Sequence, residues 1–195
     1  TLISLILLNK LLFSNDCDKF ASVEEVPDYN DILYKEAIKS CEKQLKDFPE
    51  NKDYLYQLAR AYYAAEDYEK SINLVRKALD NGSKGALELL AYHYYYGEGT
   101  KKNLKKAMSL FQKSSDLGFI DSTITLADIF AYGDDGIKKN EKKAFELMKK
   151  AENQGFSLDV VNYLGAAYIH GIGVPRDINK AIYYLEIAEK NDDPH

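Results

Sequence analysis

The sequence predicts an all-α protein built from stacked helix pairs. A short phrase that begins with Leu occurs three times, and a Gly follows each of these Leu residues seven positions later. An Ala then opens a second apolar stripe at Ala107, Ala144 and Ala181, in equal steps of 37 residues. A fixed period of this size is typical of stacked supersecondary units, which usually present a long binding surface and seldom carry a catalytic site. The three phrases are Leu90-Ala91-Tyr92, Leu126-Ala127-Asp128 and Leu164-Gly165-Ala166.

Each unit reads as two helices joined by a glycine-rich loop. In residues 86–121, apolar side chains recur at helical spacing until Gly97-Glu98-Gly99, where glycine suits the positive φ that a helix end and a tight loop need. Asn103 is then expected to cap a second helix by accepting a hydrogen bond from an unpaired backbone amide. The same order is expected in residues 122–158 and 159–193, with Asn140 and Asp177 as the caps.

Shorter helical segments precede these units. Residues 53–85 carry two apolar stripes with a tighter connection, which lacks the glycine-rich insertion. Residues 32–47 are typical of a further helix that ends before Pro49, within an N-terminal cap over residues 15–52. The expected organisation is one helical array with the parts 1–14, 15–52, 53–85, 86–121, 122–158 and 159–193.

The first 14 residues form an apolar segment with two interpretations. The run from Leu2 to Phe13 is too short to span a bilayer and suits the hydrophobic region of a secretory signal peptide. Asn9-Lys10 interrupts the run, so an ordinary buried helix is the alternative. Export would place the protein in the periplasm or outside the cell, where Cys17 and Cys41 can form a disulfide. A cytoplasmic protein would keep both thiols free. No membrane span is expected in the mature chain.

Composition and motifs exclude several classes of function. The net charge is −5, with acids and bases interspersed, so the chain lacks the basic surface that nucleic-acid binding requires. The three histidines lack metal-binding spacing, and no nucleophile or phosphate-loop motif is present. We therefore expect no catalytic residue, no metal site and no cofactor. The 16 tyrosines can serve either as packing bulk between helices or as a ligand surface.

The last three units resemble Sel1-like repeats. The third unit carries the best match, through Leu164-Gly165-Ala166-Ala167-Tyr168, Gly171-Ile172-Gly173-Val174, Asp177 and Lys180-Ala181. The first keeps Gly97-Glu98-Gly99 and Lys106-Ala107, whereas the second has an inserted Asp in its loop and Phe130 at the Tyr position. Residues 53–85 are similar to a tetratricopeptide repeat, which has a related fold.

This resemblance implies an α-solenoid of antiparallel helix pairs in a right-handed superhelix, with the first helices lining a concave groove. It also implies a scaffold for protein–protein contacts, so the expected partner is a protein or peptide, and the oligomeric state stays open. Some exported members are described as β-lactamase-like, which gives an alternative: an exported β-lactamase-like or peptidoglycan-linked protein. Those members carry a cysteine pair in every repeat, whereas this chain has no Cys after Cys41.

The residues that flank each apolar stripe are the candidates for partner binding. If the first helices line a groove, side chains stepped along the helical period should point into it, and aromatics mixed with a few charges suit a peptide-binding surface. The stretch from Tyr92 to Tyr96 is the densest part, while Tyr94 is expected to pack between repeats. The candidates are Tyr56, Arg60, Tyr63, Glu88, Tyr92, Tyr95, Tyr96, Asp128, Tyr132, Asn162 and His170.

Overall fold

The computed structural model describes residue 17 and residues 30–192. Secondary structure in this part is helical, apart from an isolated bridge between Asp134 and Ile137, which confirms the all-α prediction. The chain divides into two compact units, Thr1–Ala107 and Met108–His195, and each is described by itself. The apolar segment at 1–14 and residues 18–29 of the expected N-terminal cap lie outside the described residues.

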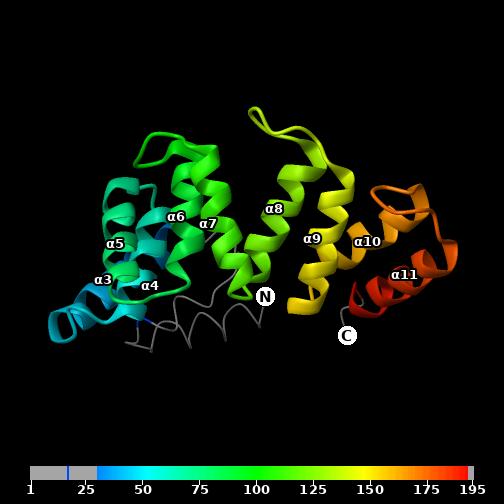
Figure 1. Ribbon diagram of the computed structural model, residues 1–195. Coiled ribbons are helices and arrows are strands. Elements are labelled where there is room, and N and C mark those ends of the chain that lie inside the picture. The colour runs from blue at the N-terminus through cyan, green and yellow to red at the C-terminus, as the bar shows by residue number, and fades with distance from the viewer. Residues whose placement is uncertain (1–16, 18–29, 193–195) are drawn as a thin grey trace. The chain divides into compact units, whose positions relative to one another are not determined.

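The helices pack in consecutive pairs (Figure 1). In the first unit α3 packs on α4, α4 on α5 and α5 on α6; in the second unit α8 packs on α9, α9 on α10 and α10 on α11. The division between the units falls inside α7. The bounds are α3 Asn30–Asp47, α4 Lys52–Ala64, α5 Tyr68–Asp80, α6 Ala86–Tyr92, the π-helix η1 His93–Gly97, α7 Leu104–Asp116, α8 Ile120–Tyr132, α9 Glu141–Gln154, α10 Leu158–His170 and α11 Ile178–Asp192.

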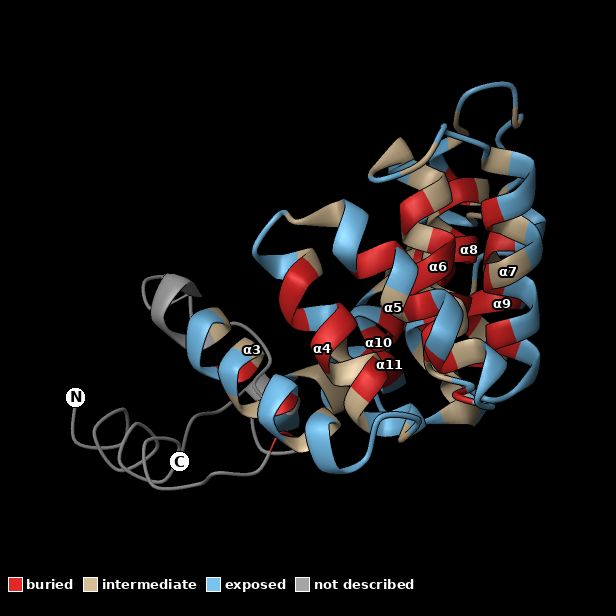
Figure 2. Ribbon diagram, turned by 90° about the vertical axis from the view of Figure 1, so that its left-hand side faces the viewer, coloured by how far each residue is buried: buried red, intermediate tan, exposed pale blue. Residues whose placement is uncertain are grey.

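Buried and exposed segments alternate along each helix, as the amphipathic pattern requires (Figure 2). The repeated alanines lie on the buried side: Ala144 of α9 is 0% exposed and Ala181 of α11 is 1% exposed. A side chain this small lets two helix axes approach closely where the pair packs. The 37-residue step in the sequence therefore marks equivalent packing positions on α9 and α11.

One arrangement closes each helix pair at the same place. An aromatic residue in the last turn of the first helix has a carbonyl without an intrahelical partner, and the residue that caps the second helix donates its backbone N–H to that carbonyl. The cap side chain accepts a hydrogen bond from the backbone N–H of a lysine three residues later. The ammonium group of this lysine lies over the aromatic ring.

This closure, as we name it, occurs four times. The distances from cap nitrogen to aromatic carbonyl are 2.9, 2.7, 2.7 and 3.0 Å in chain order, and those from lysine Nζ to ring centroid are 4.8, 4.1, 4.0 and 5.1 Å. It therefore tolerates both the tight and the glycine-rich loops, and it confirms the three predicted caps. The sets are Tyr62, Asp67 and Lys70; Tyr94, Asn103 and Lys106; Phe130, Asn140 and Lys143; and Tyr168, Asp177 and Lys180.

The second glycine of each Gly-x-Gly loop packs closely against the backbone of a preceding helix. Gly99 lies against the carbonyl of Tyr68, at the start of α5, and Gly173 lies against the carbonyl of Glu141, at the start of α9. In both cases a Cβ atom would overlap the carbonyl, and in both cases φ is positive, at +66° and +69°. Each of these two loops is therefore seated on the first residue of a preceding second helix.

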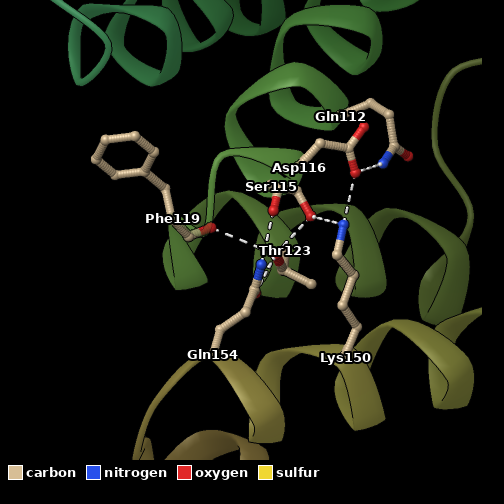
Figure 3. Close-up of polar contacts among 7 residues, drawn as sticks. All are labelled: Gln112, Ser115, Asp116, Phe119, Thr123, Lys150 and Gln154. Carbon is tan, nitrogen blue, oxygen red and sulfur yellow. Dashed lines mark hydrogen bonds and ion pairs between the residues drawn. The ribbon is translucent and has the colours of Figure 1, made fainter.

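A buried polar network joins α7, α8 and α9 in the second unit (Figure 3). The ammonium of Lys150 donates to Ser115 Oγ at 2.9 Å, the Ser115 hydroxyl can donate to Thr123 Oγ1 at 2.6 Å, and Thr123 donates to Gln154 Oε1 at 2.6 Å. Gln154 Nε2 donates a hydrogen bond to the backbone carbonyl of Ser115 at 2.6 Å. Because every member has a partner, the network holds the turn between α7 and α8 without leaving a buried polar group unpaired.

The two cysteines lie in the core of the first unit. The structure places Cys17 and Cys41 as a disulfide, buried in one cluster with Leu58 and Tyr62. This is the pairing that the sequence left open. Among the described residues, no helix is both long enough and apolar enough to cross a bilayer.

Replacing Gly173 by Ala tests whether loop seating stabilises the array. The matched control is Gly136→Ala. Gly136 also has a positive φ, +92°, but a Cβ atom there would meet nothing within 4 Å. Gly136→Ala should cost about 1–2 kcal/mol of the free energy of unfolding, from backbone conformation alone. Gly173→Ala should cost a further ~1–3 kcal/mol from overlap. Urea unfolding measures both, and equal losses would show that the contact with Glu141 is unimportant.

Candidate partner-binding surfaces

Three of the predicted residues form one aromatic cluster at the end of the first helix in the repeat that begins at residue 86. The rings of Tyr92 and Tyr96 stack with centroids 6.1 Å apart and planes 11° apart, and Tyr95 meets Tyr96 edge to face at 4.8 Å. Tyr96 is 57% exposed, while Tyr92 and Tyr95 are half-buried. The structure therefore brings these three predicted residues together as a packed surface, which we call the tyrosine cluster.

The tyrosine cluster is carried on a π-helical turn that the sequence did not reveal. Residues His93–Gly97 form η1, in which the N–H of Glu98 bonds to the carbonyl of His93. The imidazole of His93 is 0% exposed and lies between Ser71 Oγ, at 2.9 Å from Nε2, and the Glu98 carbonyl, at 2.8 Å from Nδ1. Burial holds the pKa of His93 below its usual value. Single π-helical turns are found frequently at functional sites.

Tyr63, another of the predicted partner-binding residues, has a role inside the first unit. Its hydroxyl donates to the carboxylate of Glu98 at 2.5 Å, and its ring packs edge-on against Tyr68 and His93. Burial and the Glu98 carboxylate raise the pKa of this phenol. Tyr63 therefore helps to hold the Gly97–Gly99 loop.

Tyr94, which the sequence placed between repeats, belongs to the closure of its own repeat and also interacts with Arg76 of α5, in the preceding repeat. Its hydroxyl accepts a hydrogen bond from Lys106 Nζ at 2.7 Å.

The other candidates in the first unit lie on α4 and α6. The guanidinium of Arg60 lies 5.9 Å from the ring centroid of Tyr56, at the edge of cation–π range. The Tyr56 ring also packs where a Cβ on Gly85 would be 3.1 Å away, so the glycine makes room for the ring. Glu88 is half-buried on α6.

In the second unit, two of the four candidates line a hollow of about 480 Å³. Asp128 and Tyr132 reach it from α8, and Tyr132 is 80% exposed. Asn162 and His170 are exposed on α10 and are not among its lining residues. The volume falls in the range of ordinary ligand pockets. The lining residues are Ile124, Asp128, Ala131, Tyr132, Lys139, Glu141, Met148, Asp159, Tyr163, Ala166 and Ile172.

The hollow, as we call this cavity, is acidic at its polar positions. It holds three carboxylates and one ammonium, and Lys139 Nζ pairs with Glu141 Oε1 at 2.7 Å. Burial, and then the nearby charge of Asp159, raise the pKa of Asp128. Within the described part of the chain, neither Asp128 nor Asp159 forms a salt bridge. The hollow therefore presents two carboxylates whose charge no described cation offsets by direct contact.

Sequence reasoning missed most of these lining residues for a geometric reason. The candidates were chosen by taking the same side of every first helix. The hollow takes Asp128 and Tyr132, which follow Leu126 on α8, but Asp159 and Tyr163, which precede Leu164 on α10. Stepping from Leu126 and from Leu164 in opposite directions would have found both sets. Across the described residues, no group of three His, Cys, Asp or Glu side chains could hold a metal ion.

Two family models match the chain. The Sel1 repeat model matches residues 124–156 and 161–193, and the model of anaphase-promoting complex, cyclosome, subunit 3 matches residues 30–114. The expected first Sel1-like unit, at 86–121, thus falls largely within the match to the anaphase-promoting complex subunit 3 model. No curated protein matches the sequence.

Solved structures show the same fold. A Sel1 repeat protein from Oxalobacter formigenes has a TM-score of 0.70 at 22% identity, over 92% of this chain and 74% of that one. The protective antigen c5321, present in uropathogenic Escherichia coli strains and displaying an SLR fold, has a TM-score of 0.68 at 20% identity, over 80% of this chain and 33% of that one. The sequence thus matches the Sel1 repeat at residues 124–156 and 161–193, and these structures show that the chain has the fold of Sel1-like repeat proteins, a tetratricopeptide-like class of helical repeats.

Proposed function

We propose that this chain is a non-enzymatic interaction module that binds a protein or peptide partner through the exposed flanks of its first helices. The observation that carries this proposal is the tyrosine cluster. The closure uses one aromatic residue per repeat, and in this repeat that residue is Tyr94. Tyr92, Tyr95 and Tyr96 are additional aromatics, so their presence at a surface needs a reason other than the shared architecture of the repeat.

The chemistry of the tyrosine cluster suits a binding surface. Tyrosine offers a large, rigid apolar face with a polar tip, and it is enriched among the residues that dominate binding energy at protein interfaces. The packing of the three rings on one another fixes them before a partner arrives, which reduces the entropy lost on binding. In the second unit, the hollow offers a concave surface with exposed Tyr132 among its lining residues.

Capture from a native extract tests this function. The parent chain is compared with the triple variant Tyr92→Ala/Tyr95→Ala/Tyr96→Ala, and we expect capture of the partner to fall about tenfold or more, because hot-spot tyrosines typically contribute at least that much. Tyr183→Ala is the matched control, since Tyr183 is also 57% exposed but lies on α11, a second helix. Thermal melts first establish that all three proteins fold alike. Equal capture by the triple variant and the parent would refute the tyrosine cluster as the binding site.

We further propose that the protein folds in an oxidising compartment, the periplasm or the cell exterior. The support is the burial of Cys17 and Cys41 as a disulfide in one apolar cluster. The protein is isolated from its natural source, denatured, alkylated and examined by mass spectrometry. We expect alkylation of neither cysteine before reduction and of both after it. Modification of both cysteines without reductant would favour the cytoplasm.

A further inference from the structure

The hollow of the second unit has two kinds of lining that point to one kind of ligand. Its apolar lining includes Ile124, Met148 and Ile172, and its polar positions include Asp128 and Asp159. An apolar lining suits an aliphatic chain, and two carboxylates that form no salt bridge with any described residue suit a ligand with a positive charge at the end of that chain. Arginine and lysine side chains combine these two properties.

The state of Asp128 supports a cationic ligand independently of shape. This residue is half-buried in the middle of α8, away from either helix end, whereas Asp159 lies in the first turn of α10, where the helix dipole stabilises a negative charge. Since burial and a like charge both disfavour the ionised form, an ionised Asp128 costs stability in the unliganded protein. A residue that is unfavourable for folding and lines a cavity is typical of a site shaped for binding.

A tyrosine in the same hollow has an unmet hydrogen-bonding group. The hydroxyl oxygen of Tyr163 is buried and has no hydrogen-bond partner among the described residues. A buried polar atom without a partner costs free energy, and a ligand that brings N–H donors into the hollow would recover it. The exposed ring of Tyr132 adds a surface over which a planar cation can stack.

We propose that the hollow between α8 and α10 binds an arginine side chain of the partner, flanked by apolar residues. Arginine fits better than lysine because its planar guanidinium has five N–H donors, enough for two carboxylates and a phenol oxygen, and because it stacks on aromatic rings. This inference rests on the proposed function and specifies the partner's chemistry at one of its two surfaces. The tyrosine cluster plays no part in it.

Nuclear magnetic resonance titration of the full, isotope-labelled chain tests this proposal. The probe is the pentapeptide acetyl-Gly-Leu-Arg-Leu-Gly-amide, and its control replaces arginine by citrulline, which has nearly the same shape without the charge. We expect saturable shifts at the hollow's lining residues, with binding about tenfold weaker for the citrulline peptide. The double variant Asp128→Asn/Asp159→Asn should bind the arginine peptide at least about tenfold more weakly, and Glu146→Gln, an exposed acid of α9 outside the hollow, should bind it as the parent does.

The outcomes separate this inference from the proposed function. Equal affinity for the arginine and citrulline peptides, shifts outside the hollow, or no saturation at millimolar peptide would each overturn the arginine site. Partner capture that depends on the tyrosine cluster would still establish the interaction module in that case. The Asp128→Asn single variant guards against misfolding, because removing a desolvated charge should leave the melting temperature equal to or above that of the parent. A variant that stays folded and keeps full affinity for the arginine peptide contradicts the proposal.

Discussion

The closure of each helix pair is the interaction on which the other features depend. A carbonyl in the last turn of the first helix and the N–H of the second helix's cap satisfy each other, so two helix ends are paired through backbone groups. The lysine that follows the cap covers the ring of the same aromatic residue. Because these contacts are local in sequence, each repeat can fix its own helix crossing, and the loops between the paired ends can vary. The loop at Gly133-Asp134-Asp135-Gly136 carries an insertion, and the backbone N–H of Asn140 still donates to the carbonyl of Phe130.

The closure also decides which aromatic residues remain for other roles. One tyrosine or phenylalanine per repeat is held by its cap and its lysine, and Tyr63 is held by Glu98 next to the buried imidazole of His93. Among the described first helices, the exposed aromatic residues are Tyr96, in the tyrosine cluster of the first unit, and Tyr132 in the second. The two surfaces differ in chemistry: one is a set of packed rings, and the other is a hollow in which Asp128 and Asp159 form no salt bridge with a described residue. Such a difference gives a repeat protein selectivity along its length without a change of fold.

Much of the architecture was predictable from the sequence because the determinants are local. The recurring Leu and Ala positions and the caps at Asn103, Asn140 and Asp177 each act within one repeat, and the structure confirms them. The π-helical turn was not predictable, because it depends on contacts of His93 with Ser71 and with the Glu98 carbonyl. The hollow was only half predictable, since α8 contributes residues that follow Leu126 whereas α10 contributes Asp159 and Tyr163, which precede Leu164. A rule that treats all first helices alike finds Asp128 but not Asp159 or Tyr163.

The central claim is that partners contact the first helices and not the second. Photo-crosslinking in native extract tests it most directly, with a benzoylphenylalanine placed in turn at Tyr96, at Tyr132 and at Tyr183. All three are exposed tyrosines, at 57%, 80% and 57%, but Tyr183 lies on the second helix α11. We predict crosslinked partner from the positions of Tyr96 and Tyr132 and none above background from that of Tyr183. Crosslinks from Tyr183 alone, or equal crosslinks from all three positions, would contradict the account.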